Sequence, residues 1–247
     1  MEQRGSYTRL TAEEQGVSRR TAPKVLLIIP AYNEVDNIAR VVGTLDRDYP
    51  QYDYLVVNDG SRDGTADECR AHGYRLLDLP INLGLSGAFQ AGIKYAYEHG
   101  YDCAIQFDAD GQHLPEYIES LVKALEGSDI VIGSRFIKSE KQASMRMFGS
   151  SLLSGMIRLT TGRHLSDPTS GMRAYGPRAI AELVTGPNLG PEPDTIAYLM
   201  KKKGLSVSEV PVTMAERQAG ESYLNWKSSS SYMIRMTISV LLIQFFR

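Results

Sequence analysis

The sequence predicts an α/β fold in which a doubly wound, mostly parallel sheet is flanked by helices. Three observations lead to this expectation. Short apolar runs, typical of strands buried on both faces, alternate with amphipathic helical patterns. The connections between these segments are short. Polar clusters follow three of the predicted strands at their carboxyl ends, where open parallel sheets bind ligands.

Predicted strands and helices alternate along the first half of the chain. Residues 24–30 form a continuous apolar run that ends at proline, and residues 34–45 repeat apolar side chains at helical spacing. In chain order, the following elements are expected at residues 54–57 (strand), 63–72 (helix, capped by its first aspartate), 75–79 (strand), 85–98 (helix), 103–107 (strand), 114–125 (helix), 130–133 (strand) and 195–203 (helix).

Composition narrows the class of protein. The 247 residues carry 27 lysines and arginines against 29 aspartates and glutamates, a net charge of −2, which argues against a protein that coats nucleic acid. Hydrophobic residues make up 43% of the chain, as in ordinary globular proteins. Two cysteines and four scattered histidines exclude a cysteine–histidine zinc cluster and fit a reducing, cytoplasmic setting.

Three regions are expected along the chain. Residues 1–23 are polar, lack the apolar stretch of a signal peptide, and are predicted to form a tail. Residues 24–222 would form the α/β domain. Residues 223–247 are largely apolar, and a helix over 232–246 would be about 22 Å long, too short for a hydrocarbon core of about 30 Å. Flanking basic residues favour an amphipathic helix on a membrane surface, with core packing or an oligomer contact as alternatives.

Two aspartates, Asp108 and Asp110, directly follow the predicted strand at 103–107. Carboxylates two residues apart at a strand end can converge on one hard cation, Mg²⁺ or Mn²⁺, that also binds phosphate oxygens. An acidic turn that caps the next helix is the simpler explanation. Two further polar strand ends, at residues 32–34 and 59–61, favour the metal site.

A nucleotide diphosphate on that metal would need contacts to its base and ribose. Tyr32 can pack on a base, and Asp59 can accept hydrogen bonds from base or ribose, although residues 59–61 would also serve as a plain turn. The glycine-rich residues 82–87 precede a helix but lack the lysine of a P-loop and do not match the dinucleotide-binding pattern. Kinases and dehydrogenases are therefore disfavoured.

Four motifs in order resemble family 2 glycosyltransferases of the GT-A fold, and most closely the polyprenyl-phosphate sugar transferases typified by dolichol-phosphate mannose synthases. The motifs are IPAYNE at 29–34, VNDGS at 57–61, DADGQH at 108–113 and DPTSGMR at 167–173. The resemblance extends over about residues 24–222.

The resemblance implies a nucleotide-diphospho-sugar donor, linked to UDP or GDP, and a metal ion, Mg²⁺ or Mn²⁺, held by Asp108, Asp110 and Gln112. Arg135 would lie near the diphosphate. Arg217 lies in a segment similar to the family's Arg-x-x-Gly-x-Ser loop, where its planar fork can pair with phosphate, although a solvated surface arginine is the alternative. The implied donor-binding residues are Pro30, Ala31, Tyr32, Glu34, Asp59, Asp108, Ala109, Asp110, Gln112, Arg135 and Arg217.

The expected reaction is an inverting sugar transfer to a polyprenyl (undecaprenyl) phosphate, for cell-envelope glycan synthesis at the inner face of the membrane. A phosphate acceptor is already a nucleophile near neutral pH and needs no base. The expected catalytic residues are Asp108, Asp110, Asp194 and Arg217.

Two other functions stay open. Transfer to a sugar hydroxyl of a growing polysaccharide would need a carboxylate base, for which Glu192, Asp194 and Asp167 are candidates. Helix capping is the alternative role of Glu192 and Asp194. A catalytically inactive sugar-nucleotide-binding protein is the third function, and the intact pair of Asp108 and Asp110 argues against it.

Overall fold

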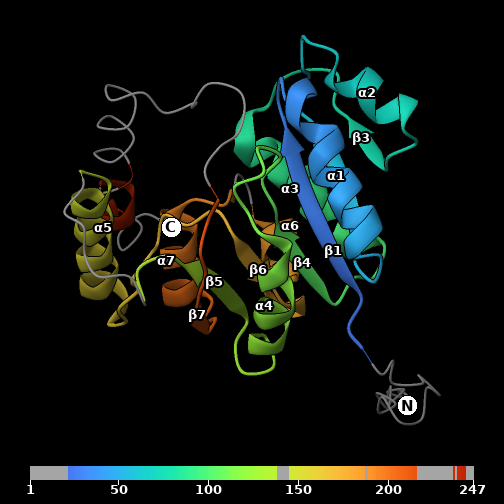
Figure 1. Cartoon of the computed structure of the whole chain (residues 1–247). Helices are drawn as coiled ribbons and strands as arrows, with labels where there is room; N and C mark the ends of the chain where they lie inside the picture. The colour runs from blue at the N-terminus through green and yellow to red at the C-terminus, as the bar shows by residue number, and fades with distance from the viewer. Residues whose placement is uncertain (1–21, 138–144, 187–188, 216–235, 237, 243–247) are drawn as a thin grey trace, which may run out of the picture.

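The computed structural model describes residues 22–137, 145–186, 189–215, 236 and 238–242, with side chains for all of these except residues 145–150. One sheet runs through this part of the chain in the order β3-β2-β1-β4-β6-β5-β7 (Figure 1). Its strands are β1 (Val25–Ala31), β2 (Asp53–Asn58), β3 (Leu76–Asp78), β4 (Cys103–Gln106), β5 (Ile130–Ser134), β6 (Arg173–Tyr175) and β7 (Val207–Pro211).

The sheet is mostly parallel, as expected. β1 pairs in parallel with both β2 and β4, β2 pairs in parallel with β3, and β5 with β7. The short strand β6 runs antiparallel to both of its neighbours, β4 and β5. The helices are α1 (Val35–Asp48), α2 (Thr65–Ala71), α3 (Gly84–Glu98), α4 (Ile118–Ala124, after the 3₁₀ turn η1 at Pro115–Tyr117), α5 (Met145–Thr161), α6 (Pro177–Thr185) and α7 (Pro193–Lys202).

The expected aspartate cap of α2 takes a different form. The cap position belongs to Gly64, and no side chain caps the helix there. Asp63 instead accepts from the backbone amides of Thr65, at 2.9 Å, and of Val35, at 3.2 Å, so that it ties the starts of α1 and α2 together. Burial alone would raise the pKa of Asp63, but the hydrogen bond from the Thr65 hydroxyl, together with those from the two amides, outweighs burial and lowers the pKa below its usual range.

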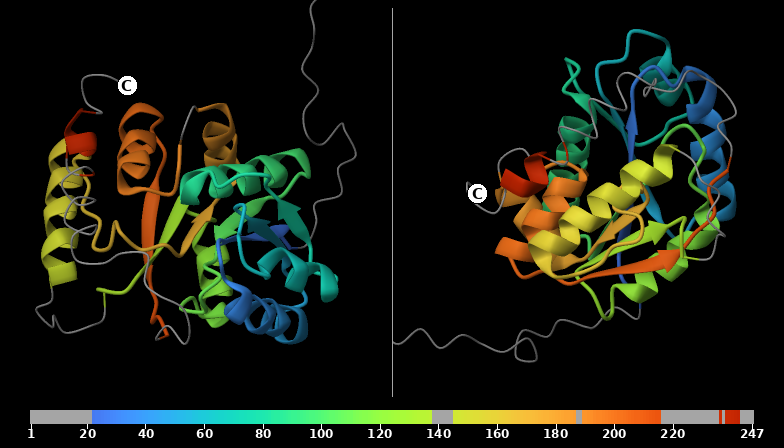
Figure 2. Two further views of the ribbon diagram at one scale, coloured as in Figure 1. Left: turned by 90° about the horizontal axis from the view of Figure 1, so that it is seen from above. Right: turned by 90° about the vertical axis from the view of Figure 1, so that its left-hand side faces the viewer.

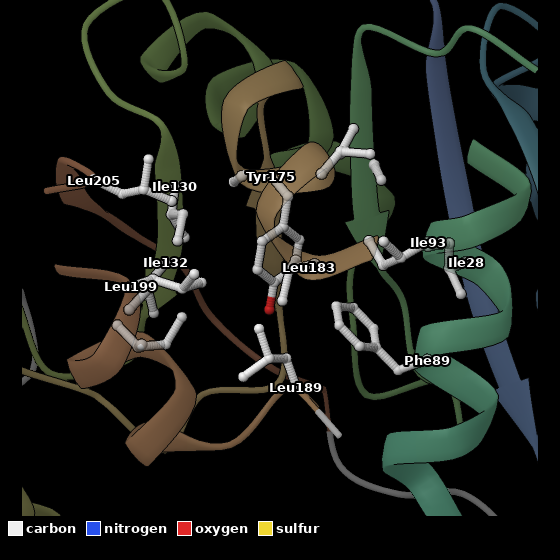
Figure 3. Close-up of a cluster of buried hydrophobic side chains, with 14 of the residues drawn as sticks. Ile28, Phe89, Ile93, Ile130, Ile132, Tyr175, Leu183, Leu189, Leu199 and Leu205 are labelled. Carbon is white, nitrogen blue, oxygen red and sulfur yellow. The ribbon is translucent and has the colours of Figure 1, made fainter. Parts of the chain in front are cut away.

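Helices cover both faces of the sheet, with α1 and α4 on one side and α3, α6 and α7 on the other (Figure 2). Successive side chains of a strand point to opposite faces. On β1, Leu26 and Ile28 therefore join the core layer under α3, α6 and α7, whereas Leu27 and Ile29 join the layer under α1 and α4. The first layer contains Phe89 beside the buried ring of Tyr175 (Figure 3). An uninterrupted apolar strand is thus explained by two separate cores.

The C-terminal residues that the structure describes are helical and lie beside α5 and α7 (Figures 1 and 2). Met236 and Val240 are buried in the core layer of α7, while Ile238 and Leu242 are exposed. These described residues are amphipathic, and the rest of the expected segment 223–247 lies outside the described residues. Within the described ranges, no helix combines the length and the apolar character that crossing a bilayer requires.

Helix α3 lies close to β1 because Gly92 has no side chain. A β-carbon built on Gly92 would come within 2.3 Å of Cγ2 of the buried Ile28. By contrast, Gly155 of α5 is exposed and a β-carbon there would meet nothing within 4 Å. The two glycines form a matched pair of helical sites.

We expect Gly92→Ala to lower the free energy of unfolding by about 1–3 kcal/mol, because a filled contact must be forced apart. Gly155→Ala should instead raise it by about 0.5–1 kcal/mol, since alanine is the better helix former. Urea unfolding followed by circular dichroism measures both. Equal effects of the two substitutions would contradict the close packing of α3 on β1.

Candidate active site

The loops after β1, β2 and β4 lie at one edge of the sheet, because these strands are parallel neighbours. The amide of Asp59 donates to the carbonyl of Ala31 at 2.8 Å, which joins the ends of β1 and β2 directly. Pro30 and Ala31 belong to β1, and the half-buried Tyr32 follows them. The structure therefore brings the predicted residues after β1, β2 and β4 together.

Asn33 locks the first two loops against each other. Its φ of +56° lies in the left-handed region, which asparagine tolerates better than most residues. The Asn33 amide donates to Oγ of Ser61 at 2.9 Å, and its Oδ1 accepts from the amide of Arg62 at 2.8 Å. The neighbouring Glu34 accepts from Nδ2 of Asn37 at 2.7 Å, so its carboxylate turns along α1.

Asp59 supports the loop that leads into α3. Its side chain is buried, and Oδ1 accepts from the amide of Leu83 at 2.7 Å. Burial raises the pKa of Asp59 above its usual value, and the amides of Leu83 and Gly84 offset part of that rise. The carboxylate expected to meet base or ribose thus also holds the backbone of the glycine-rich segment.

The turn of Asp108 and Asp110 is held by short local hydrogen bonds. Oδ1 of Asp108 accepts from Nε2 of Gln106 at 3.2 Å, and the side chain of Asp108 is 35% exposed. Asp110 is buried, and its Oδ1 accepts from the amide of Gln112 at 2.9 Å. No side-chain hydrogen bond caps η1, so capping of the next helix does not explain this pair.

Gln112 connects this turn to the chain segment after β7. Its carbonyl accepts from the amide of Ala215 at 2.9 Å, and its Nε2 faces the Ala215 carbonyl at 3.5 Å. Arg217 lies outside the described residues, as does the rest of the Arg-x-x-Gly-x-Ser segment. The contact nevertheless brings the chain two residues before Arg217 to the aspartate turn.

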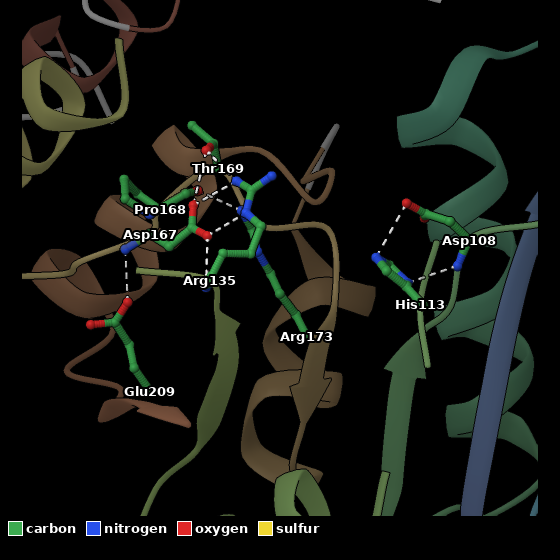
Figure 4. Close-up of polar contacts among 8 residues, drawn as sticks. All are labelled: Asp108, His113, Arg135, Asp167, Pro168, Thr169, Arg173 and Glu209. Carbon is green, nitrogen blue, oxygen red and sulfur yellow. Dashed lines mark hydrogen bonds and ion pairs between the residues drawn. The ribbon is translucent and has the colours of Figure 1, made fainter. Parts of the chain in front are cut away.

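Arg135 lies at the end of β5 and forms a two-pronged ion pair with Asp167 (Figure 4). Its Nε and Nη2 donate to the two carboxylate oxygens at 2.6 and 2.8 Å, and the Asp167 side chain is fully buried. Glu209 of β7 accepts from the amides of Ser166 and Asp167 at 2.7 and 2.8 Å. Asp167, a candidate base, is therefore committed to orienting Arg135.

Arg173 joins the loop before β6 to the loop before α7. It is buried at the start of β6, and its guanidinium donates to the carbonyls of Pro168, at 2.6 Å, and Pro191, at 2.5 Å. Pro191 immediately precedes Glu192. The Arg173 guanidinium thus fixes the position of the loop that carries Glu192, a candidate base.

Glu192 and Asp194 line a cavity of about 470 Å³ between the N-termini of α3 and α7. Glu192 accepts from Oγ of Ser86 and makes no side-chain cap of α7. Asp194 accepts from the amide of Thr195 at 2.9 Å and from Oγ of Ser239 at 2.5 Å. Helix capping is therefore excluded as the role of the Glu192 side chain. The cavity is lined by Leu83, Ser86, Gly87, Gln90, Glu192, Asp194, Thr195 and Met236.

Several residues of the site had no assigned role at the level of sequence. Gln106 could have been identified from the sequence as a residue of the site, because it is a polar residue inside an apolar strand. His113 and Arg173 belong to the motifs but have no role by motif alone. Ser86 and Glu209 meet partners 106 and 42–43 residues away, which no local pattern reports.

Comparison with known proteins agrees with this arrangement. The profile of Glycosyl transferase family 2 matches residues 26–184, which include the loops after β1, β2, β4 and β5 and the segment before β6. The chain belongs to glycosyl transferase family 2. The family expected from the four motifs is thereby confirmed.

Two curated relatives of this family 2 glycosyltransferase align over most of both chains. The undecaprenyl-phosphate mannosyltransferase of Micrococcus luteus is 36% identical over 217 residues, 82% of this chain and 88% of the relative. The polyprenol monophosphomannose synthase of Mycolicibacterium smegmatis is 31% identical over 246 residues, 91% of this chain and 90% of the relative.

Solved structures confirm the GT-A fold expected for this family 2 glycosyltransferase. Glucosyl-3-phosphoglycerate synthase from Mycobacterium tuberculosis, in complex with phosphoglyceric acid, matches with a TM-score of 0.67 and 20% identity over 90% of this chain and 80% of that chain. The same enzyme in complex with Mn²⁺, UDP and phosphoglyceric acid matches with a TM-score of 0.65 and 19% identity over 90% and 78% of the two chains.

We expect Asp167→Asn to lower the free energy of unfolding by about 2–4 kcal/mol, because it removes the buried charge that pairs with the half-buried fork of Arg135. Glu209→Gln is the matched control, since glutamine keeps one oxygen for one of the two amides and should cost about 1–2 kcal/mol. Urea midpoints at constant m-value measure both. A smaller loss in Asp167→Asn than in Glu209→Gln would contradict the assignment.

Proposed function

We propose that this family 2 glycosyltransferase transfers a sugar, with inversion, from a nucleotide-diphospho-sugar to a polyprenyl phosphate in cell-envelope glycan synthesis. The observation that carries this proposal is the similarity to the M. luteus and M. smegmatis proteins, which extends over 82% and 91% of this chain. It therefore includes the loops on both sides of the predicted site. We assign catalysis to residues 24–222.

A divalent cation, Mg²⁺ or Mn²⁺, is the proposed cofactor, held by Asp108, Asp110 and Gln112. In the ranges that the structure describes, no group of three or more His, Cys, Asp and Glu side chains is placed to hold a metal. Two adjacent carboxylates are a donor set that suits these cations when phosphate oxygens and water complete the coordination. The Mn²⁺ and UDP of the M. tuberculosis structure support this assignment. Such a cation supplies charge neutralisation of a diphosphate leaving group.

The proposed donor lies along the loops after β1 and β2, against Pro30, Ala31, Tyr32, Glu34 and Asp59. The buried Asp59 and the left-handed Asn33 keep these loops in place before the donor binds. Ala109, between the two aspartates, also belongs to this set, and Arg135 and Arg217 are proposed to meet the diphosphate. The donor is a UDP- or GDP-linked sugar, and the donor panel of the assay below separates the two.

The basic residues proposed at the site favour a phosphate over a sugar hydroxyl as the acceptor. Arg135 is held at the site edge by Asp167, and the chain two residues before Arg217 contacts Gln112. Two guanidinium groups suit phosphate oxygens, whose negative charge needs no deprotonation. The second candidate function, transfer to a glycan hydroxyl, rests on Glu192, which faces the 470 Å³ cavity. Asp194, which lines the same cavity and accepts from Ser239, is the other candidate base there.

The enzyme is proposed to work as a peripheral protein at the cytoplasmic face of the membrane. We define the apolar patch as Leu152 and Leu159 of α5 with Ile238 and Leu242, four exposed side chains on two helical segments that lie side by side (Figure 2). Arg158 and Arg163 are exposed and lie close in sequence to Leu159, and their positive charges suit anionic lipid. The remainder of residues 223–247 is proposed to add to this contact.

The direct test incubates the protein with radiolabelled UDP- and GDP-sugars and undecaprenyl phosphate, and then extracts lipid. We expect label in the lipid phase, and a loss of about 100-fold or more with Asp110→Asn or excess chelator, because leaving-group charge is then uncompensated. Wild-type transfer in the presence of chelator would contradict the metal assignment.

The same assay separates the two acceptor classes. For a phosphate acceptor, Arg217→Ala should lose about 10- to 150-fold in kcat/KM, with partial recovery in Arg217→Lys, while Glu192→Gln stays near wild type. Glutamine is the matched change because it still accepts from Ser86. An inactive Glu192→Gln variant beside a fully active Arg217→Ala would instead favour the hydroxyl acceptor.

Membrane contact through the apolar patch predicts that Leu152→Ser/Leu159→Ser weakens binding to phosphatidylglycerol vesicles about 30-fold, since two leucines lose about 2 kcal/mol of apolar burial. Tyr97→Ser, on the exposed face of α3, is the control because Tyr97 is 55% exposed and outside the patch. Co-sedimentation measures the partition coefficient. Unchanged binding of the double variant would refute the patch.

A further inference from the structure

His113 is buried directly beside the aspartate turn, and both of its ring nitrogens face Asp108 (Figure 4). The amide of Asp108 donates to Nδ1 at 2.9 Å. On the other side of the ring, Nε2 lies 3.4 Å from Oδ2 of the Asp108 carboxylate. The same residue is therefore contacted at its backbone and at its side chain by one imidazole.

The first of these contacts decides where the ring proton lies. Because a backbone N–H can only donate, Nδ1 must present its lone pair to Asp108. In the neutral ring the proton is then on Nε2, the nitrogen that lies 3.4 Å from the carboxylate. The hydrogen bond at Nδ1 thus assigns the Nε2–H tautomer, which places a polar N–H group beside Oδ2 of Asp108.

The surroundings hold this ring and this carboxylate in one arrangement. Phe107 meets the imidazole edge-on, with ring centroids 5.6 Å apart. Gly171 covers the pair so closely that a β-carbon there would lie 3.1 Å from Oδ2 of Asp108 and 3.5 Å from Nε2 of His113. The other oxygen, Oδ1, accepts from the buried Gln106. Each carboxylate oxygen of Asp108 therefore faces a buried nitrogen.

We propose that His113 is a positioning residue: its Nε2–H group, beside Oδ2, favours one orientation of the Asp108 carboxylate for the divalent cation, and its Nδ1 closes the turn. The proposal rests on the proposed metal role of Asp108. Groups that hold a metal-binding carboxylate reduce the orientations that binding must otherwise freeze out, and their loss typically costs 10- to 100-fold in metal affinity.

Two substitutions separate the two contacts. In His113→Asn the side-chain oxygen takes the place of Nδ1, so the Asp108 amide stays paired while the donor to the carboxylate is lost. In His113→Gln the longer side chain brings its amide near the place of Nε2, so the donor is kept and the Asp108 amide loses its partner. His164→Asn is the control, because it makes the same histidine-to-asparagine substitution at an exposed position.

The experiment measures Mn²⁺ binding to the full chain by electron paramagnetic resonance, with UDP and separately with GDP present, alongside thermal unfolding. We expect His113→Asn to bind Mn²⁺ about 10-fold more weakly with a Tm within about 3 °C of wild type. His113→Gln should keep the Mn²⁺ affinity within about threefold of wild type and should lower the Tm more than His113→Asn does. In an Asp108→Asn background, His113→Asn should cause no further loss of affinity, because it acts through that carboxylate.

Two results would overturn the proposal while the metal site itself stands: wild-type affinity in His113→Asn, or an additional loss in the Asp108→Asn background. Failure of the wild-type chain to bind Mn²⁺ with either nucleotide would instead overturn the metal assignment under the proposed function. Nitrogen-15 NMR of the metal-free wild-type protein supplies an independent check. A protonated Nδ1 on His113 would overturn the proposal even if the variants failed to fold.

Discussion

Parallel pairing of β1 with β2 on one side and β4 on the other makes all three strands end at the same edge of the sheet. The polar segments at residues 32–34, 59–61 and 108–110 are far apart in sequence, and this pairing alone makes them neighbours. It depends on β1 being apolar on both faces, since each face must bury its side chains under a different set of helices. The two cores therefore determine where the chemistry of the protein can take place.

Around that edge, buried polar groups connect loops through backbone atoms rather than through one another. Asp59 accepts from an amide of the segment before α3, and Glu209 accepts from two amides before β6. Arg173 donates to one carbonyl before β6 and to one carbonyl after it. Hydrogen bonds of this kind are costly to leave unmade in a low-dielectric interior. The loops are consequently arranged before any substrate binds, which is the condition for electrostatic stabilisation of a transition state.

The sequence predicted the half of the fold in which strands are long apolar runs, and the motifs predicted the family. It did not predict α5, β6, α6 or β7. β6 is a three-residue strand that contains a buried arginine, and every residue of β7 is half-buried, so neither shows the periodicity of a strand. Within the site, the carboxylates were identified but several of their partners were not, because contacts such as Ser86 with Glu192 link positions 106 residues apart. Residues that can do chemistry are recognised from local sequence, whereas the residues that position them are found only in the folded structure.

The reversed direction of β6 has a consequence for how this chain can diverge. A strand that runs against its neighbours delivers its amino end to the edge where they deliver their carboxyl ends. The DPTSGMR segment therefore reaches the site although it precedes a strand, while the Gly176 connection to α6 emerges at the far edge, beside Asp129 and Arg178. Insertions directly before β6 would alter the candidate site, whereas insertions at the Gly176 connection would alter only the far edge of the sheet. The two ends of one short strand are thus free to evolve under separate selection.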